Sequence, residues 1–140
     1  MYLIDTNVIS ELRKAGRAHA GVRAFFETAR EAVHPLYLSV ITVGELRRGV
    51  EQIRYRGDLS QAQLLDTWLQ GVLTDYQANI LPFGPEAAQV WGRLRVPHPQ
   101  HELDKQIAAT ALVYGLTVVT RNSADFADCG VPLLNPFLDA

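Results

Sequence analysis

The chain has 140 residues, the size of one domain, and we expect a single domain over residues 1–140. Its composition, 48% hydrophobic and 20% charged, is that of a globular protein, and its net charge of −2 by itself argues against a nucleic-acid-binding protein. The sequence has no apolar run near the ~20 residues that span a bilayer, no signal-peptide pattern and only one cysteine, Cys129. These features exclude an internal disulfide and predict a cytoplasmic protein without membrane contact.

Short apolar strands alternate with helices along the chain. The predicted elements are strand 2–4, helix 6–13, helix 18–32, strand 36–40, helix 42–55, helix 59–78, strand 79–81, helix 84–94, helix 102–114, strand 116–120, turn 122–127 and a last strand near 132–134. Pro35 ends the second helix, and Gly115 is a C-cap signal for the helix before it. This order predicts a parallel α/β sandwich, and right-handed crossovers place helices on both faces of its sheet.

Four carboxylates from distant parts of the sequence are predicted to meet at one edge of that sheet. Asp5 follows the first strand, Glu45 lies in the first turn of the helix after the second strand, and Asp125 lies beyond the strongest strand. Asp104 lies in the first turn of the helix that leads into that strand. Ligands of open parallel sheets bind outside the carboxyl ends of the strands, so these acids are candidate site residues.

Each acid also has a purely structural interpretation. These interpretations are Asp5 as a helix cap, Thr42 and Glu45 as a capping box, Asp104 at a helix dipole, and Asp125 three residues after a capping Asn122. A cap contributes roughly 1 kcal/mol, whereas two carboxylates about 5 Å apart repel by about 3 kcal/mol at an effective dielectric constant of about 20. Capping therefore does not offset the gathering of four carboxylates, whereas a bound divalent cation does.

The donor chemistry favours Mg²⁺, with Mn²⁺ as a substitute. All four candidate side chains are hard oxygen donors, and no soft donor accompanies them. His98 and His101 lie three residues apart on a proline-rich loop without a nearby cysteine, which argues against a zinc site there.

Positive charge gathers after Glu45. Without the four candidate acids, the chain has 13 basic and 11 acidic residues, and 11 of the basic residues are arginine. Four of these lie close together in the sequence: Arg47, Arg48, Arg54 and Arg56. The guanidinium group suits phosphate, so this segment is a candidate RNA-contacting surface; a solvated helix face is the alternative.

Four segments, in order along the chain, resemble the motifs of PIN-domain nucleases. They are Leu-Ile-Asp-Thr-Asn-Val-Ile-Ser at 3–10, Thr-Val-Gly-Glu-Leu-Arg-Arg-Gly at 42–49, Asp-Lys-Gln-Ile-Ala-Ala-Thr-Ala at 104–111, and Thr-Arg-Asn-Ser-Ala-Asp-Phe at 120–126 followed by Leu-Asn-Pro at 134–136. The resemblance covers the whole chain and is closest to VapC-type toxins of bacterial VapBC toxin–antitoxin pairs.

The resemblance implies a PIN-like three-layer sandwich with about five short parallel strands and a Mg²⁺-dependent endoribonuclease. It also implies a homodimer or larger assembly with a small VapB-type antitoxin whose tail blocks the cleft. Asp5, Glu45, Asp104 and Asp125 take the family's catalytic positions. Thr6 and Asn122 would support the metal or the scissile phosphate. A departure is Lys105-Gln106, where relatives carry apolar residues; Lys105 either orients phosphate or is simply exposed.

The mechanism expected from these assignments is hydrolysis of RNA by metal-activated water. Asp5, Asp104 and Asp125 would hold Mg²⁺, and Glu45 would position or deprotonate the attacking water. RNA would lie along Arg47 and Arg48, whose phosphate contacts set position rather than sequence.

Other functions fit the sequence less well. A haloacid-dehalogenase-type phosphohydrolase needs a second aspartate two residues after the first, where this chain has Asn7, and a receiver domain needs an early acidic pair. A PIN-like interaction module without catalytic activity is the non-enzymatic alternative, and the presence of all four acids argues against it. The apolar stripe of Trp68, Leu69, Val72 and Tyr76 is either core or part of an antitoxin groove.

Overall fold

A computed structural model describes residues 1–138. The elements are β1 (Tyr2–Ile4), α1 (Thr6–Glu11), the 3₁₀ helix η1 (Leu12–Arg17), α2 (Ala20–Glu31), β2 (Leu36–Ser39), α3 (Val40–Tyr55), α4 (Leu59–Asp75), η2 (Gln77–Asn79), β3 (Ile80–Leu81), α5 (Pro85–Leu94), α6 (Glu102–Tyr114), β4 (Thr117–Val119), η3 (Ser123–Cys129) and β5 (Leu133–Leu134). None of the helices in this range combines the length and apolar character that crossing a bilayer requires.

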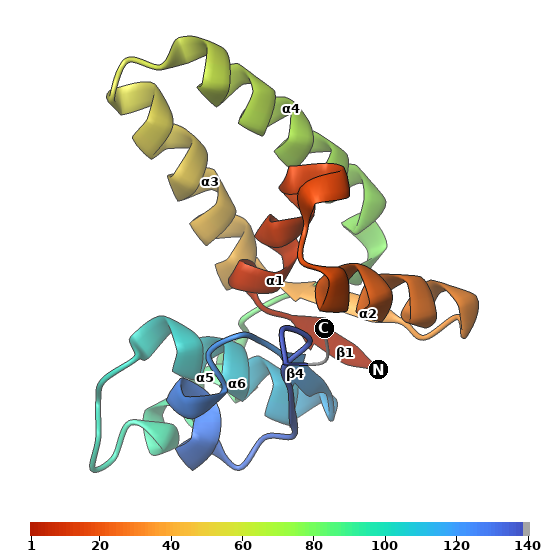
Figure 1. The fold of residues 1–140 in the computed structure, drawn as a ribbon. Helices are drawn as coiled ribbons and strands as arrows, with labels where there is room; N and C mark the ends of the chain where they lie inside the picture. Colours follow the sequence, from red (N-terminus) through yellow and green to blue (C-terminus); the bar gives the residue numbers. More distant parts are fainter. Residues whose placement is uncertain (139–140) are drawn as a thin grey trace.

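The five strands form one sheet in the order β3-β2-β1-β4-β5, and every neighbouring pair is parallel. In the register of the central strand, Leu3 pairs with Tyr37 of β2 on one side and with Val118 of β4 on the other. The predicted parallel sheet of about five strands is therefore confirmed. Because all strands are parallel, their carboxyl ends share one edge, on the left in Figure 1, away from the N-terminus.

Helices cover both faces of the sheet, as predicted. In Figure 1, α1 to α4 lie above β1, whereas α5 and α6 lie below it. Alternate residues of β1 enter the two cores: Ile4 packs into the cluster that contains Leu69 of α4, and Leu3 packs into the cluster that contains Ile107 of α6 and Phe126 of η3. The second core therefore anchors both segments that carry Asp104 and Asp125.

Helix α3 begins two residues earlier than the sequence pattern predicts, and the capping box at Thr42 is wrong. The N-cap is Ser39, the last residue of β2, whose hydroxyl oxygen accepts a 3.0 Å hydrogen bond from the backbone amide of Ile41. The strand passes directly into the helix because Ser39 satisfies this amide at the strand end. Glu45 therefore lies in the second turn of α3, not the first, and does not cap the helix.

The end of α6 follows the prediction. Gly115 adopts the left-handed conformation with φ of 69°, and its amide bonds back to the carbonyl of Ala111. This conformation carries no Cβ penalty in glycine, so the helix stops here and the chain enters β4 at Thr117. The predicted helix 6–13 instead changes to a 3₁₀ helix at Leu12, and the predicted turn at 122–127 is the 3₁₀ helix η3.

Candidate metal centre

Asp5 lies immediately after β1 and is almost fully buried, with 3% of its surface exposed. Its carboxylate accepts hydrogen bonds from the backbone amide of Thr6 at 2.7 Å, the Thr120 hydroxyl at 2.8 Å and the Asn7 side-chain amide at 3.2 Å. The hydrogen bond from the Thr6 amide also makes Asp5 the N-cap of α1, so Asp5 is both a helix cap and a residue of the site. Three donors fix the orientation of this carboxylate before any ligand binds.

Glu45 reaches the same edge from α3. The Thr6 hydroxyl donates to Glu45 Oε1 at 2.9 Å and lies 3.3 Å from the hydroxyl oxygen of buried Thr42. Thr6 therefore links the carboxylate of α3 to the end of β1. The predicted site residue Thr6 is thus in the site as a partner of Glu45.

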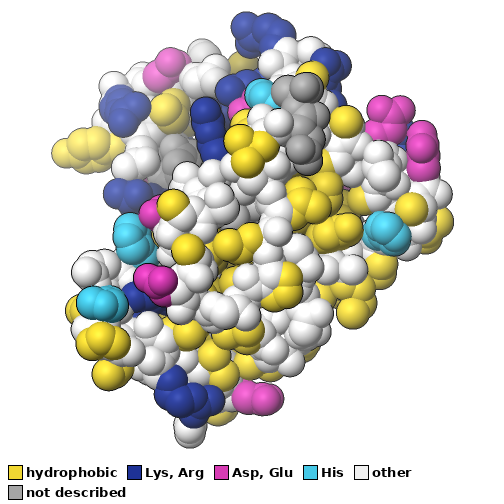
Figure 2. Space-filling view, turned by 60° about the horizontal axis from the view of Figure 1, so that its bottom comes forward, with side chains coloured by type: hydrophobic (Ala, Val, Ile, Leu, Met, Phe, Trp, Pro, Cys, Tyr) yellow, Lys and Arg dark blue, Asp and Glu magenta, His cyan; other side chains and the backbone are white. Residues whose placement is uncertain are grey.

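Asp104 and Asp125 face each other from the start of α6 and from η3. His101 lies beside both: its Nδ1 is 4.0 Å from Asp104 Oδ2, and its Nε2 is 3.9 Å from Asp125 Oδ1. One donor atom from each of these three residues lies within 4.8 Å of the other two. On the left of the molecule, Figure 2 shows histidine and acidic side chains next to one another on the surface.

Burial and neighbouring negative charges raise the pKa values of two of these acids, Asp5 and Asp104. Burial, and after it the negative charges of Asp104 and Glu45, raise the pKa of Asp5 to about 6, although Thr120 and Thr6 lower it by donating hydrogen bonds. Burial, then Asp125, then Glu45 raise the pKa of Asp104, and His101 lowers it. The structure therefore brings the four predicted carboxylates to one edge of the sheet, with Asp104 and Asp125 in a close cluster with His101 and with Asp5 and Glu45 linked through Thr6. Their chemical roles stay predictions.

The two predicted arginine contacts differ in environment. Arg47 binds Asp66 at 3.0 Å and Glu51 at 3.2 Å, and Arg54 shares the same two acids. The Arg47 guanidinium is the largest cause that lowers the pKa of Asp66, to about 2. Arg48, by contrast, is exposed and lies with Arg56 and Tyr55 around a shallow surface pocket.

Asn122 is exposed, and its backbone amide donates to the Thr120 hydroxyl oxygen at 3.0 Å. It therefore lies one hydrogen bond away from the group that holds Asp5. Its side chain makes no capping hydrogen bond to η3.

Sequence reasoning missed three supporting residues. Thr120 bridges Asp5 and Asn122, and Asn7 accepts from the backbone amide of Arg121 at 3.0 Å while its side chain donates to Asp5. Thr120 is a polar residue directly after β4, and Asn7 lies in the first turn of the helix that follows β1, so their places near the strand ends are the signal that could have identified them. His101 was considered only as part of a zinc pair with His98, because its neighbours Asp104 and Asp125 are apparent only in three dimensions.

Both interpretations of Lys105 are wrong. Lys105 is buried, and its ammonium group donates to the backbone carbonyl of His98, in the loop before α6. This hydrogen bond satisfies the ammonium group inside the protein and fixes the loop that carries His101. A buried ammonium requires such a partner, because burying an unpaired charge is costly.

Comparison with known proteins places this chain in a family. The PIN domain family model matches residues 2–131. The chain is 34% identical to VapC ribonuclease Y4jK of Sinorhizobium fredii over 143 residues, covering 98% of both chains, and 33% identical to toxin FitB of Neisseria gonorrhoeae, covering 99% of this chain and all of that one. It superposes on the crystal structure of FitAcB from Neisseria gonorrhoeae with a TM-score of 0.84 at 34% identity, over 98% of this chain and 99% of that one. The chain therefore belongs to the PIN-domain family, among relatives named as VapC ribonucleases and FitB toxin.

Proposed function

We propose that residues 1–140 form a single cytoplasmic nuclease domain, the Mg²⁺-dependent endoribonuclease toxin of a type II toxin–antitoxin pair. One observation carries the proposal: Asp5, Glu45, Asp104 and Asp125 gather at the carboxyl edge of the sheet, where Thr6 links Asp5 to Glu45 and where Asp104 and Asp125 lie in one cluster with His101. Repulsion between clustered carboxylates destabilises a purely structural site. In a cation site the bound ion offsets that repulsion, so the same cluster is useful there. The membership of the PIN family supports the same reaction class.

The residues present fit a divalent cation. Asp5 is already oriented by three donors, and Asp104 and Asp125 offer further carboxylate oxygens at the same sheet edge. Carboxylate oxygens are the ligands that Mg²⁺ and Mn²⁺ prefer. Asp5, Asp104 and Asp125 would hold the ion, which would offset their charge and activate water for attack on a phosphodiester.

The chain's own groups perform the remaining work. Glu45 is held by the Thr6 hydroxyl at 2.9 Å, so its free oxygen can take the proton of the attacking water. Thr120 and Asn7 keep the carboxylate of Asp5 from rotating. The side-chain amide of the exposed Asn122 lies at the same edge and can donate to a phosphate oxygen. Preorganised donors of this kind reduce the reorganisation that the reaction needs.

The direct test uses purified protein and a labelled mixed RNA pool, with Mg²⁺ or with EDTA. We expect cleavage only with Mg²⁺, products with 5′-phosphate ends, and a loss of at least about 100-fold in Asp104→Asn, because a ligand carboxylate is removed. Asp128→Asn is the matched control, since Asp128 is an exposed acid three residues beyond Asp125. Products with a 2′,3′-cyclic phosphate would exclude the metal-activated water, and the absence of cleavage together with no stabilisation of the protein by Mg²⁺ would favour an inactive interaction module.

Arg48 is expected to contribute more to RNA affinity than Arg47. Both remain proposed RNA contacts, but Arg47 is already neutralised by Asp66 and Glu51, whereas Arg48 is exposed. Arg48→Ala should weaken RNA binding severalfold and reduce the slope of log affinity against log salt by about 1, while Arg47→Ala should change the slope less. Filter binding at several salt concentrations measures both; equal slopes for the wild type and Arg48→Ala would contradict the assignment.

The proposed partner is a small VapB-type antitoxin, in a homodimeric or larger toxin–antitoxin assembly. Solved structures of similar fold include a toxin–antitoxin complex from Klebsiella pneumoniae, with a TM-score of 0.70. A groove of about 650 Å³ between α2 and α4 suits an amphipathic segment: Phe26, Trp68, Val72 and Tyr76 are among its apolar residues. Leu69 and Val72 themselves are buried core, as one interpretation of the α4 stripe predicted, whereas Trp68 and Tyr76 are only partly buried.

A further inference from the structure

His101 is held beside the candidate metal centre by contacts on both sides of it. Before it, buried Lys105 binds the carbonyl of His98; after it, the Trp91 indole donates to the carbonyl of Glu102 at 3.2 Å. Arg95 adds a 2.9 Å bond to the Glu102 side chain and stacks on Trp91 with its guanidinium carbon 4.5 Å from the ring centroid. The contacts between α5 and α6 therefore fix the path of the loop and the position of His101.

The backbone of His101 adopts a conformation that most residues avoid. Its φ and ψ are 60° and 49°, in the left-handed region, and its side chain makes no capping hydrogen bond to α6. This conformation costs roughly 1–2 kcal/mol in a residue with a Cβ. A glycine at this helix start would avoid that cost, so the imidazole is placed at the acids at the expense of stability.

The imidazole faces two acids of the site without forming a hydrogen bond to either. Its nitrogens lie 4.0 Å from Asp104 and 3.9 Å from Asp125, beyond hydrogen-bond range. Two ligand atoms on one ion, each about 2.1 Å from it, are separated by roughly 3.0–4.2 Å. Because one donor atom from each of the three residues lies within 4.8 Å of the other two, small side-chain rotations would bring all three onto one ion.

We propose that His101 is a nitrogen ligand of this metal centre and gives the site a preference for a first-row transition metal ion over Mg²⁺. Imidazole nitrogen binds Co²⁺ or Zn²⁺ far better than it binds Mg²⁺, which takes oxygen ligands. The Asp-Asp-His set formed by Asp104, Asp125 and His101 thus differs in metal preference from a site of carboxylates alone. The inference rests on the proposed metal site and adds a ligand to it.

The test measures metal binding by calorimetry, without RNA, using Co²⁺ alone and Mg²⁺ alone as probes. We expect His101→Gly to lower Co²⁺ affinity by about tenfold or more and Mg²⁺ affinity by less than about twofold. Glycine suits the positive φ, so this variant should melt no lower than the wild type. The visible absorption of bound Co²⁺, which reports its ligands, should change in the same variant.

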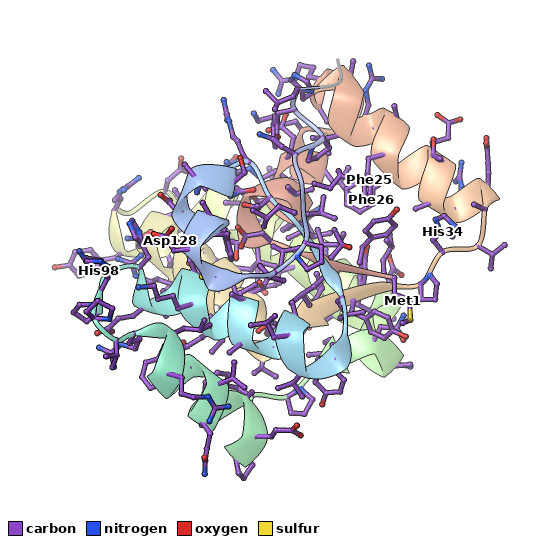
Figure 3. The ribbon with its side chains drawn as sticks, turned by 90° about the horizontal axis from the view of Figure 1, so that it is seen from below. Met1, Phe25, Phe26, His34, His98 and Asp128 are labelled. Carbon is purple, nitrogen blue, oxygen red and sulfur yellow. The ribbon has the colours of Figure 1, made fainter. Side chains whose placement is uncertain are left out.

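His98→Ala is the matched control. His98 lies on the same loop, but it supplies only its backbone carbonyl to Lys105, and Figure 3 places its side chain at the outer edge of the molecule. Both affinities should be unchanged in this variant. If His101→Gly lowers both affinities equally, or neither, His101 is not a ligand and the proposal is overturned.

Asp104→Asn separates this inference from the proposed function. If it abolishes binding of both ions while His101→Gly changes neither affinity, the metal site stands and only the His101 assignment falls. If Asp104→Asn leaves both affinities unchanged, the metal site itself falls, and the His101 assignment falls with it.

Discussion

Replacing Asp5 with asparagine is expected to abolish RNA cleavage and, in metal-free protein, to raise the melting temperature. The first effect follows because Asp5 is a proposed metal ligand, and we expect a loss of at least about 100-fold in rate. The second follows because the buried carboxylate of Asp5 is costly when ionised. The protein would then maintain a destabilising charge that only a bound cation compensates.

The expected gain in stability depends on pH in a defined direction. The pKa of Asp5 rises from 3.8 to about 6 on folding, chiefly through burial, so the folded protein holds this proton more tightly than the unfolded chain. The free energy of unfolding therefore falls as pH rises from 3.8 through 6, by about 3 kcal/mol in total. Asparagine carries no charge, but its amide rearranges the bonds to Thr120 and Asn7, which offsets about 1 kcal/mol of the gain.

Thermal melts in EDTA at pH 5 and pH 7.5 measure this difference. The Asp5→Asn variant should melt several degrees above the wild type at pH 7.5 and lose most of that advantage at pH 5. Adding Mg²⁺ should stabilise the wild type and not the variant. Asp128→Asn, at an exposed acid, should melt within about a degree of the wild type. A variant less stable than the wild type at pH 7.5 would show that the ionised Asp5 side chain does not destabilise the folded protein.

Replacing Phe126 with alanine is expected to cause a large loss of stability, about 3–5 kcal/mol. Phe126 is fully buried in η3 and packs in the second core with Ile107, Leu116 and Val118. Its ring is the main apolar anchor of the short segment that carries Asp125. Alanine leaves a cavity there, so the segment should loosen as well as the core.

Denaturant unfolding measures the stability, and calorimetry with Mg²⁺ measures the effect on the site. Phe126→Leu, which keeps most of the side-chain volume, should lose roughly 1 kcal/mol and retain metal binding. Leu64→Ala, at an exposed position of α4, should change stability by less than about 0.5 kcal/mol. A loss below about 1.5 kcal/mol for Phe126→Ala would mean that the core collapses around the cavity and does not anchor Asp125 in the way we infer.

The sequence alone predicted the parallel α/β architecture, because it depends on local patterns. The alternation of short apolar strands with helices, the stop at Gly115 and the run that became β4 are all visible in the order of residues. The four acids were predictable for a related reason. In a parallel sheet, the segments that follow the strands share an edge, so Asp5 and Asp125 are placed there by the topology, as are Glu45 and Asp104 near the starts of their helices. The ordered motifs that resemble the PIN domain point to the same four acids.

The contacts that orient the side chains around the candidate site were apparent only in the tertiary structure. The start of α3 depended on whether Ser39 or Thr42 caps it, and both have the required hydroxyl. Whether Arg47 is available to RNA depended on Asp66, which approaches from a different helix. His101 reaches Asp104 and Asp125 only because Lys105 and Trp91 hold its loop in place. These contacts join residues from separate elements, and their free energies depend on distances of a few ångströms that no one-dimensional pattern contains.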